Sequence, residues 1–140
     1  MRTRRAFTLI ELLLVMVILA VLAALVLPRF AGRSEDARQK AAQTQITSLF
    51  GLALDVYEAD NGSYPSTTQG LDALWGQPTG TPEAKNWKGP YLKSQAPQDP
   101  WGNAYVYRQP GTKNPSAYDL SSSGADGREG TEDDITSWVQ

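Results

Sequence analysis

Hydrophobic and polar positions divide this 140-residue chain into one long apolar run near its start and a mixed remainder. Between residues 6 and 27, only Thr8 and Glu11 are not apolar. A helix over this stretch would be roughly 33 Å long at about 1.5 Å per residue, and the hydrocarbon core of a bilayer is about 30 Å thick. Apolar side chains would surround such a helix, whereas a helix of a soluble domain carries one apolar stripe. The pattern therefore predicts a transmembrane helix over residues 7–27.

The basic residues before the apolar run predict its orientation. Arg2, Arg4 and Arg5 precede it, whereas Arg29 is soon followed by acidic side chains. Because positive charge favours the cytoplasmic side, we expect the amino terminus in the cytoplasm and residues 28–140 across the membrane. A secretory signal fits less well, since its apolar region has only about 7 to 15 residues. A plain signal anchor remains open.

Glu11 does not fit a plain anchor. A carboxylate within a membrane-spanning helix costs about 2.5 to 3.5 kcal/mol on insertion scales, so it is rarely left without a partner. No Lys, Arg or His lies between Arg5 and Arg29. The partner would therefore be Arg5 or a newly formed amino terminus, and a neighbouring subunit could supply either. On this basis Glu11 is a candidate assembly contact.

A second helical pattern follows Pro28, where we expect a kink or local melting because proline removes a backbone hydrogen bond. Residues 29–45 are expected to form a solvated or subunit-facing stalk. Asn61-Gly62 is a turn and cap signal, so the helix should end near residue 61. Between these points an apolar stripe recurs at spacings of three and four, formed by Ile46, Leu49, Phe50, Ala53, Val56 and Tyr57.

Residues 62–103 read as a proline-rich connecting loop with little regular structure apart from a short helix over residues 68–75. Leu71, Leu74 and Trp75 are expected to anchor that helix on the core. Core packing is also the expected role of four side chains further along the loop: Trp87, Tyr91, Leu92 and Trp101.

The remainder, residues 104–140, is predicted to form strands. Segments 104–108 and 116–120 are β-prone and separated by a proline- and glycine-containing stretch, which indicates a hairpin. Segment 135–139 offers a third strand. Three strands packed on a helix make a small α+β core, which is the fold class we predict.

Composition excludes several functions. The chain has no Cys and no His, so disulfides, Ser-His triads, Cys nucleophiles and the usual zinc sites are absent. A Ser-Lys or carboxylate-only hydrolase stays open, but no constellation of that kind stands out, and we expect no enzyme. The net charge of −2 becomes more negative without the three leading arginines, which argues against nucleic acid as a partner.

The segment between the second and third strands is strongly acidic. It carries five carboxylates, opposed there only by Arg128. Calcium takes six to eight oxygen ligands at flexible geometry and would suit this composition, although the spacing is not that of an EF-hand. A solvated acidic turn is the alternative on spacing alone. The carboxylates are Asp126, Glu129, Glu132, Asp133 and Asp134.

The start of the chain carries a resemblance to a known family. Residues 7–11, Phe-Thr-Leu-Ile-Glu, follow a short basic leader, as in the class III signal of type IV pilins and type II secretion pseudopilins. The resemblance implies that prepilin peptidase removes leader 1–6 after Ala6, that Phe7 is N-methylated, and that Glu11 is needed for filament assembly. The family usually has Gly where this chain has Ala6.

Motifs in the connecting loop extend the resemblance to most of the chain. Tyr64-Pro65, residues 67–71, residues 89–92 and Asp99-Pro100-Trp101-Gly102 are similar to the major pseudopilins of type II secretion. This implies a pilin-like α+β fold with a long N-terminal helix packed on a small three-stranded antiparallel sheet. It also implies a subunit of the secretion pseudopilus, a filament that drives folded exoproteins across the outer membrane.

The same resemblance implies partners, location and metal. The partners would be further copies of the chain, minor pseudopilins, prepilin peptidase, the inner-membrane secretion platform and, before assembly, inner-membrane lipid. The chain would cross the bacterial inner membrane once, with residues 28–140 in the periplasm. Ca²⁺ would bind the side chains of Asp126, Asp133 and Asp134 and the carbonyls of Ser123 and Arg128, whereas Glu129 and Glu132 would face solvent.

Two alternatives remain at this point. A type IV pilus or minor pseudopilin subunit would share the first thirty residues but usually has a disulfide or lacks the acidic loop. A bitopic periplasmic calcium-binding protein or enzyme would keep its leader and would not need Glu11.

Overall fold

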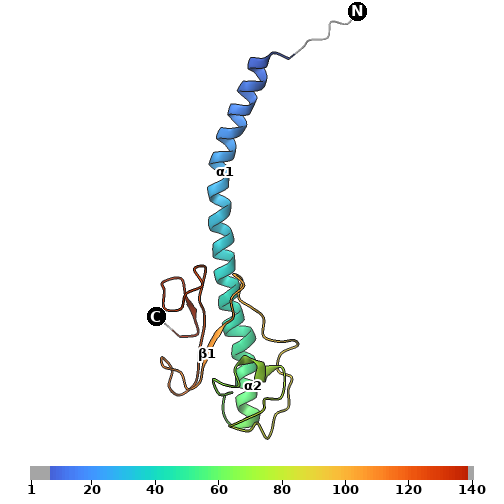
Figure 1. Cartoon of the computed structure of the whole chain (residues 1–140), viewed down its shortest axis with the longest axis vertical. Helices are drawn as coiled ribbons and strands as arrows, with labels where there is room; N and C mark the ends of the chain where they lie inside the picture. The colour runs from blue at the N-terminus through green and yellow to red at the C-terminus, as the bar shows by residue number, and fades with distance from the viewer. Residues whose placement is uncertain (1–6, 139–140) are drawn as a thin grey trace, which may run out of the picture. The chain divides into compact units, whose positions relative to one another are not determined.

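The computed structural model describes residues 7–138, except for the side chains of residues 25–31. The chain divides into two compact units, residues 1–37 and residues 38–140. The first unit is helical from Leu9 onward. The second contains the rest of the helical path, the connecting loop and the sheet (Figure 1).

Three consecutive elements form the helical path: α1 (Leu9–Thr44), the π-helical turn η1 (Gln45–Phe50) and α2 (Gly51–Asn61). Helix α1 continues through Pro28, so the local melting expected there is not seen. Loss of one backbone N–H removes one hydrogen bond, and the neighbouring turns retain theirs. The path ends as predicted at Gly62, which has φ +80° and donates its N–H to Glu58 O at 2.7 Å.

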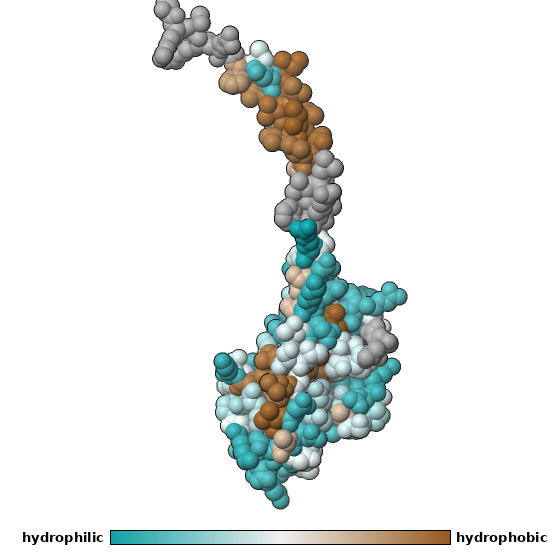
Figure 2. All heavy atoms as spheres, turned by 180° about the vertical axis from the view of Figure 1, so that it is seen from behind, coloured by the Kyte–Doolittle hydropathy of each residue, from teal (hydrophilic) through white to brown (hydrophobic). Residues whose placement is uncertain are grey.

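Apolar side chains of α1 lie exposed all round the helix. The large apolar residues between Phe7 and Leu22 are 48–80% exposed, and Figure 2 shows them as a continuous hydrophobic surface. Within the part of the chain that the structure describes, no helix combines the length and apolarity needed to cross a membrane. The transmembrane segment over residues 7–27 stays a prediction.

The second unit contains the predicted three-stranded antiparallel sheet. Strands β1 (Val106–Arg108), β2 (Asp119–Ser122) and β3 (Ile135–Thr136) lie in the order β1-β2-β3. Tyr107 pairs with Leu120, and Ser122 pairs with Ile135. The α+β fold class is confirmed.

The predicted strand bounds are wrong in detail. Strand β2 begins at Asp119, not at residue 116, because the Asp119 carboxylate holds the preceding residues in a turn. It accepts the backbone N–H groups of Thr112, Lys113 and Asn114 at 2.7–2.9 Å. Strands β1 and β3 are shorter than predicted, and the last predicted strand residue, 139, lies outside the described residues.

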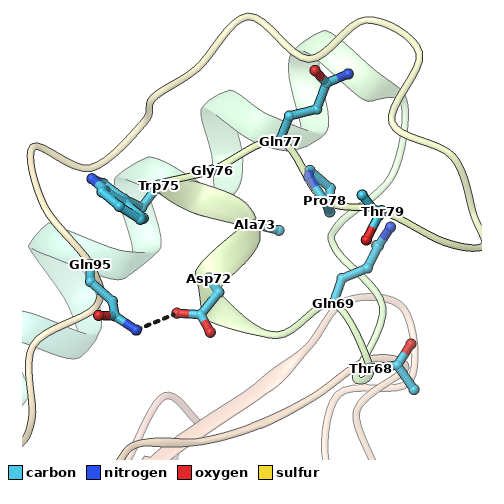
Figure 3. A pocket seen from close by; sticks show the side chains of 10 residues that line it. All are labelled: Thr68, Gln69, Asp72, Ala73, Trp75, Gly76, Gln77, Pro78, Thr79 and Gln95. Atoms are coloured by element: carbon cyan, nitrogen blue, oxygen red, sulfur yellow. Dashed lines mark hydrogen bonds between the residues drawn. The ribbon is translucent and has the colours of Figure 1, made fainter.

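The predicted short helix over residues 68–75 is wrong in type and length. It is one 3₁₀ turn, η2 (Leu71–Leu74), preceded by Gly70 at φ +60°. Leu71 and Leu74 are buried as predicted, but Trp75 is 50% exposed. The Trp75 indole borders a shallow pocket of about 380 Å³ near Asp72 and Gln95 (Figure 3). A 3₁₀ turn has three residues per turn, whereas an α-helix has 3.6, so Trp75, four positions after Leu71, no longer lies on the buried face.

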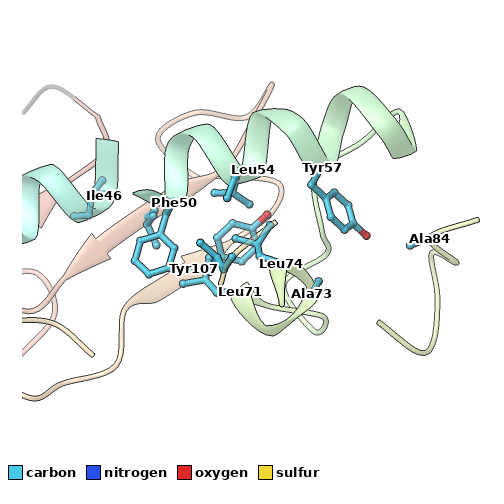
Figure 4. Packing of buried hydrophobic residues seen from close by; sticks show 12 residues of the cluster. Ile46, Phe50, Leu54, Tyr57, Leu71, Ala73, Leu74, Ala84 and Tyr107 are labelled. Atoms are coloured by element: carbon cyan, nitrogen blue, oxygen red, sulfur yellow. The ribbon is translucent and has the colours of Figure 1, made fainter. Parts of the chain in front are cut away.

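The core forms where η1 and α2 face η2 and the sheet (Figure 4). The ring of Phe50, fully buried, meets the edge of Tyr105 with centroids 4.9 Å apart. Of the predicted connecting-loop anchors, Trp87 donates its indole N–H to Ala73 O at 2.9 Å, and Leu92 is buried. The fully packed residues along the helical path are Ile46, Phe50, Ala53, Leu54 and Tyr57.

Two members of the predicted apolar stripe face outward instead. Leu49 is 39% exposed and Val56 is 44% exposed, whereas Leu54, which the stripe omitted, is fully buried. The buried residues keep the spacings of three and four that define one helical face: Ile46, Phe50, Ala53, Leu54 and Tyr57. Leu49 and Val56 lie on the flank of that face, so the predicted stripe is centred too far to one side.

Candidate functional site

The acidic loop joins β2 to β3 and is closed at its base. Gly124 has φ +61°, and a Cβ placed there would lie 2.4 Å from the carbonyl oxygen of Asp133 and 2.6 Å from its Oδ2. The two ends of the loop are therefore in direct contact. Only glycine fits both this backbone conformation and this spacing.

The structure brings Asp126 and Asp133 together through hydrogen bonds. Asp133 Oδ2 accepts the Asp126 N–H at 3.0 Å, and Asp133 Oδ1 accepts the Thr131 hydroxyl at 2.6 Å. The Thr131 bond and then the Asp126 N–H hold the pKa of Asp133 below its ordinary value. Asp126 in turn accepts the Arg128 N–H at 2.7 Å. Asp133 is thus an anionic hydrogen-bond acceptor at neutral pH, and the Asp126 carboxylate accepts a hydrogen bond from within the loop.

Asp134 has one oxygen without a partner. Its Oδ2 accepts the Gly130 N–H at 2.7 Å, but Oδ1 is buried and receives no hydrogen bond. Buried carboxylate oxygens are normally satisfied, and a cation is one group that would satisfy this one. Oxygen donors of this kind match the chemistry that calcium requires.

Ser123 and Arg128, which are predicted to supply carbonyl ligands, lie in different environments. Ser123 is buried at the end of β2, 7% exposed. The Arg128 carbonyl already accepts the Thr131 hydroxyl at 3.1 Å. Among the described residues, no three carboxylates lie close enough together to hold a metal ion. The calcium site therefore stays a prediction.

The two remaining acids of the loop, Glu132 and Glu129, lie in different environments. Glu132 is exposed, in line with its predicted contact with solvent. Glu129 is also exposed but forms a two-point ion pair with Arg108, whose Nη2 lies 2.9 Å from Glu129 Oε2. This hydrogen bond lowers the pKa of Glu129. The pairing was not predicted, because the register of the strands decides which residue of β1 faces the loop.

Sequence reasoning also missed a buried acid next to the loop. Asp99 is 4% exposed and accepts the hydroxyl of Ser122 at 2.5 Å. Its only sequence signal is the Asp-Pro-Trp-Gly run, in which an Asp side chain commonly accepts the backbone N–H groups that follow it.

The second candidate site is the start of α1. Thr8 caps the helix: the Glu11 N–H donates to Thr8 O at 3.1 Å and lies 3.4 Å from Thr8 Oγ1. Glu11 lies in the first turn of α1, where a negative charge interacts favourably with the helix dipole. Among the described residues, the ion pairs are Lys88–Asp60 and Arg108–Glu129, and neither involves Glu11. Ala6 and Arg5 lie outside the described residues, and Phe7 is 77% exposed.

These features are typical of pilin-like filament subunits. They have a long apolar N-terminal helix with an acid in its first turn, and this helix continues into one that packs on a three-stranded sheet. A sequence model for a prokaryotic N-terminal methylation motif matches residues 1–27. A second, for type II secretion system (T2SS) protein G, matches residues 29–138. The chain belongs to the type II secretion system protein G family. That family consists of structural pseudopilins, not enzymes.

Individual relatives agree along nearly the whole chain. A type II secretion system core protein G of Pseudomonas aeruginosa is 51% identical, over 98% of this chain and 96% of its own length. The Escherichia coli K12 relative of the same name is 49% identical, over 96% and 91%. The crystal structure of the major pseudopilin from the type 2 secretion system of enterohaemorrhagic Escherichia coli matches with a TM-score of 0.67 and 37% identity. It covers 79% of this chain and 94% of that chain. These matches favour the predicted major pseudopilin over a type IV pilus or minor pseudopilin subunit.

Proposed function

We propose that the chain is cleaved between Ala6 and Phe7 by prepilin peptidase, methylated at Phe7 and assembled into the type II secretion pseudopilus. The observation that carries this proposal is that one chain contains both an N-terminal methylation motif and a protein G domain. The exposed apolar surface of α1 supports it, because such a surface is stable only in lipid or against other helices. Cleavage would leave a free amino group four residues from Glu11.

In the filament, Glu11 would pair with the amino terminus of a neighbouring copy. A carboxylate in an apolar environment is costly unless it is paired. Two copies offset along their helix axes would bring the Glu11 of one beside the amine of the next. The apolar helices would then form the filament core, and residues 28–140 would form its outside.

The proposed cellular location and partners follow from this assembly. The unassembled subunit would reside in inner-membrane lipid, with its carboxyl-terminal part in the periplasm. The inner-membrane secretion platform would add it to a growing homopolymer that also carries minor pseudopilins. Growth of the filament would drive folded exoproteins across the outer membrane.

Intact-mass measurement of the membrane-extracted protein tests the processing step. The expected mass lacks residues 1–6 and carries one added methyl group, and a mass that retains Met1 would refute the proposal. Glu11→Gln should be membrane-inserted and processed yet fail to form filaments in electron micrographs. Glu132→Gln, which neutralises an exposed acid of the loop, is the matched control. Normal filaments from Glu11→Gln would contradict the pairing.

We also propose that the acidic loop binds Ca²⁺. Asp126, Asp133 and Asp134 would supply carboxylate oxygens, and Ser123 and Arg128 would supply carbonyls. The unpartnered, buried Asp134 Oδ1 and the closed base of the loop support this proposal. In a chain without disulfides, bound calcium would add directly to folding stability.

Thermal unfolding with and without calcium tests the metal site. A ligand present at a hundredfold excess over its Kd stabilises the folded state by about 2.7 kcal/mol, so Tm should rise clearly. Asp134→Asn keeps an acceptor for the Gly130 N–H but loses the charge, and should abolish the rise. Glu132→Gln should retain it. An equal rise in Asp134→Asn and wild type would remove the site.

A further inference from the structure

The turn at residues 99–103 is hydrogen-bonded to the start of the acidic loop. Asp99 Oδ1 accepts the N–H groups of Trp101 and Asn103 at 3.0 and 2.8 Å, and Oδ2 accepts the Ser122 hydroxyl. Ser122 itself is fully buried. Hydrogen bonds to a buried carboxylate are short and strong. Both oxygens of Asp99 are thus engaged, and the Ser122 hydroxyl is held in one orientation.

The fixed Ser122 hydroxyl in turn orients the peptide group between Ser123 and Gly124. While its proton is donated to Asp99, its Oγ accepts the Gly124 N–H at 3.2 Å. The Gly124 N–H and the Ser123 carbonyl belong to the same planar trans peptide, in which they point in opposite directions. The bond that fixes this N–H therefore also fixes the direction of the Ser123 carbonyl.

Asn103 holds the following peptide group. Its Nδ2 donates to Gly124 O at 3.4 Å, while its own N–H is bound to Asp99. A Cβ on Gly127 would also lie 3.5 Å from Asn103 Oδ1. The turn thus contacts the acidic loop near its start and lies close to its middle.

We propose that Asp99 and Ser122, assisted by Asn103, are positioning residues for calcium, acting through the Ser123 carbonyl. The inference rests on the proposed calcium function. Without the Ser122 hydroxyl, the peptide between Ser123 and Gly124 loses the hydrogen bond that fixes its N–H, and the Ser123 carbonyl must be ordered when the metal binds. Groups that orient metal ligands without touching the metal typically change affinity 10- to 100-fold.

Calorimetric titration of the full chain in detergent with Ca²⁺ tests this inference. Ser122→Ala should weaken binding by roughly tenfold or more. Ser121→Ala is the matched control and should bind like wild type. Ser121 is also buried, precedes Ser122 in β2, and takes no part in these hydrogen bonds. Asn103→Ala, at a partly exposed position, should also weaken binding and provides a second variant if Ser122→Ala fails to fold.

The outcomes separate this inference from the proposed function. No calcium binding by wild type overturns both. Binding that Asp134→Asn abolishes, but that Ser122→Ala and Asn103→Ala leave unchanged, overturns the positioning role alone. A merely structural role would lower the Tm of the metal-free protein and leave Kd unchanged, so unfolding without calcium is measured alongside.

Discussion

Gly124 is the position at which a side chain would disturb the acidic loop most. With φ +61°, it already favours glycine, and a Cβ would collide with the backbone and carboxylate of Asp133 at 2.4–2.6 Å. Gly127 in the same loop has nearly the same φ, +66°, but a Cβ there meets nothing closer than 3.5 Å. Alanine at these two positions therefore separates backbone conformation from close contact.

The expected magnitudes follow from these two effects. Left-handed backbone costs a non-glycine residue roughly 1–2 kcal/mol, which is the whole expected cost of Gly127→Ala. Gly124→Ala adds overpacking against a neighbouring backbone, typically about 1–3 kcal/mol. The difference of at least about 1 kcal/mol corresponds to a Tm lower by roughly 4 °C or more in a domain of this size.

Thermal unfolding followed by circular dichroism in calcium-free buffer measures this difference directly. A calcium titration of both variants then reports whether displacing Asp133 also weakens the proposed metal site, as we expect for Gly124→Ala alone. If the two variants unfold at the same temperature, Gly124 and Asp133 are not in close contact, and the closed base of the loop is refuted.

Three further predictions concern the body of the second unit. For Asp119, burial alone would raise the pKa, but hydrogen bonds from three backbone N–H groups and a hydroxyl lower it below 3.8. The stability that it contributes is therefore present above about pH 4 and lost as pH falls through the lowered folded pKa, so Asp119→Asn should show a flatter Tm profile than wild type below about pH 4. Phe50→Ala should cost about 3–5 kcal/mol in urea unfolding, and a loss below about 1 kcal/mol would contradict its place in the core. Arg108→Gln should cost less than about 1 kcal/mol, because its pair with Glu129 is half exposed and screened by salt; a larger loss in high salt would refute a purely electrostatic role.

The sequence predicts the architecture well because its strongest signals are local. The end of α2 at Gly62 depends on a cap, and the α+β class depends on long periodic segments. Errors arise where several apolar residues could occupy one buried face. Leu49, Val56 and Leu54 all lie at helical spacings from core positions, and only packing against η2 and the sheet decides that Leu54 is the buried one.

The candidate site is predicted less completely, because its supporting contacts join residues far apart in the chain. Asp99 and Ser122 are 23 positions apart, and Arg108 and Glu129 are 21 apart. Strand register and the placement of the turn at residues 99–103 bring such pairs together. Composition identifies the acidic loop, but it cannot identify the residues that orient it.

These supporting contacts bear on how calcium would act. Gly124 touches Asp133 at the base of the loop, Arg108 holds Glu129, and Asp99 restrains the first peptide through Ser122. A loop restrained in this way loses less conformational entropy when it binds a ligand. More of the binding free energy would then appear as stability of the folded state. The loop would therefore stabilise the sheet in proportion to calcium occupancy, and weakening any one restraint should reduce affinity before it unfolds the domain.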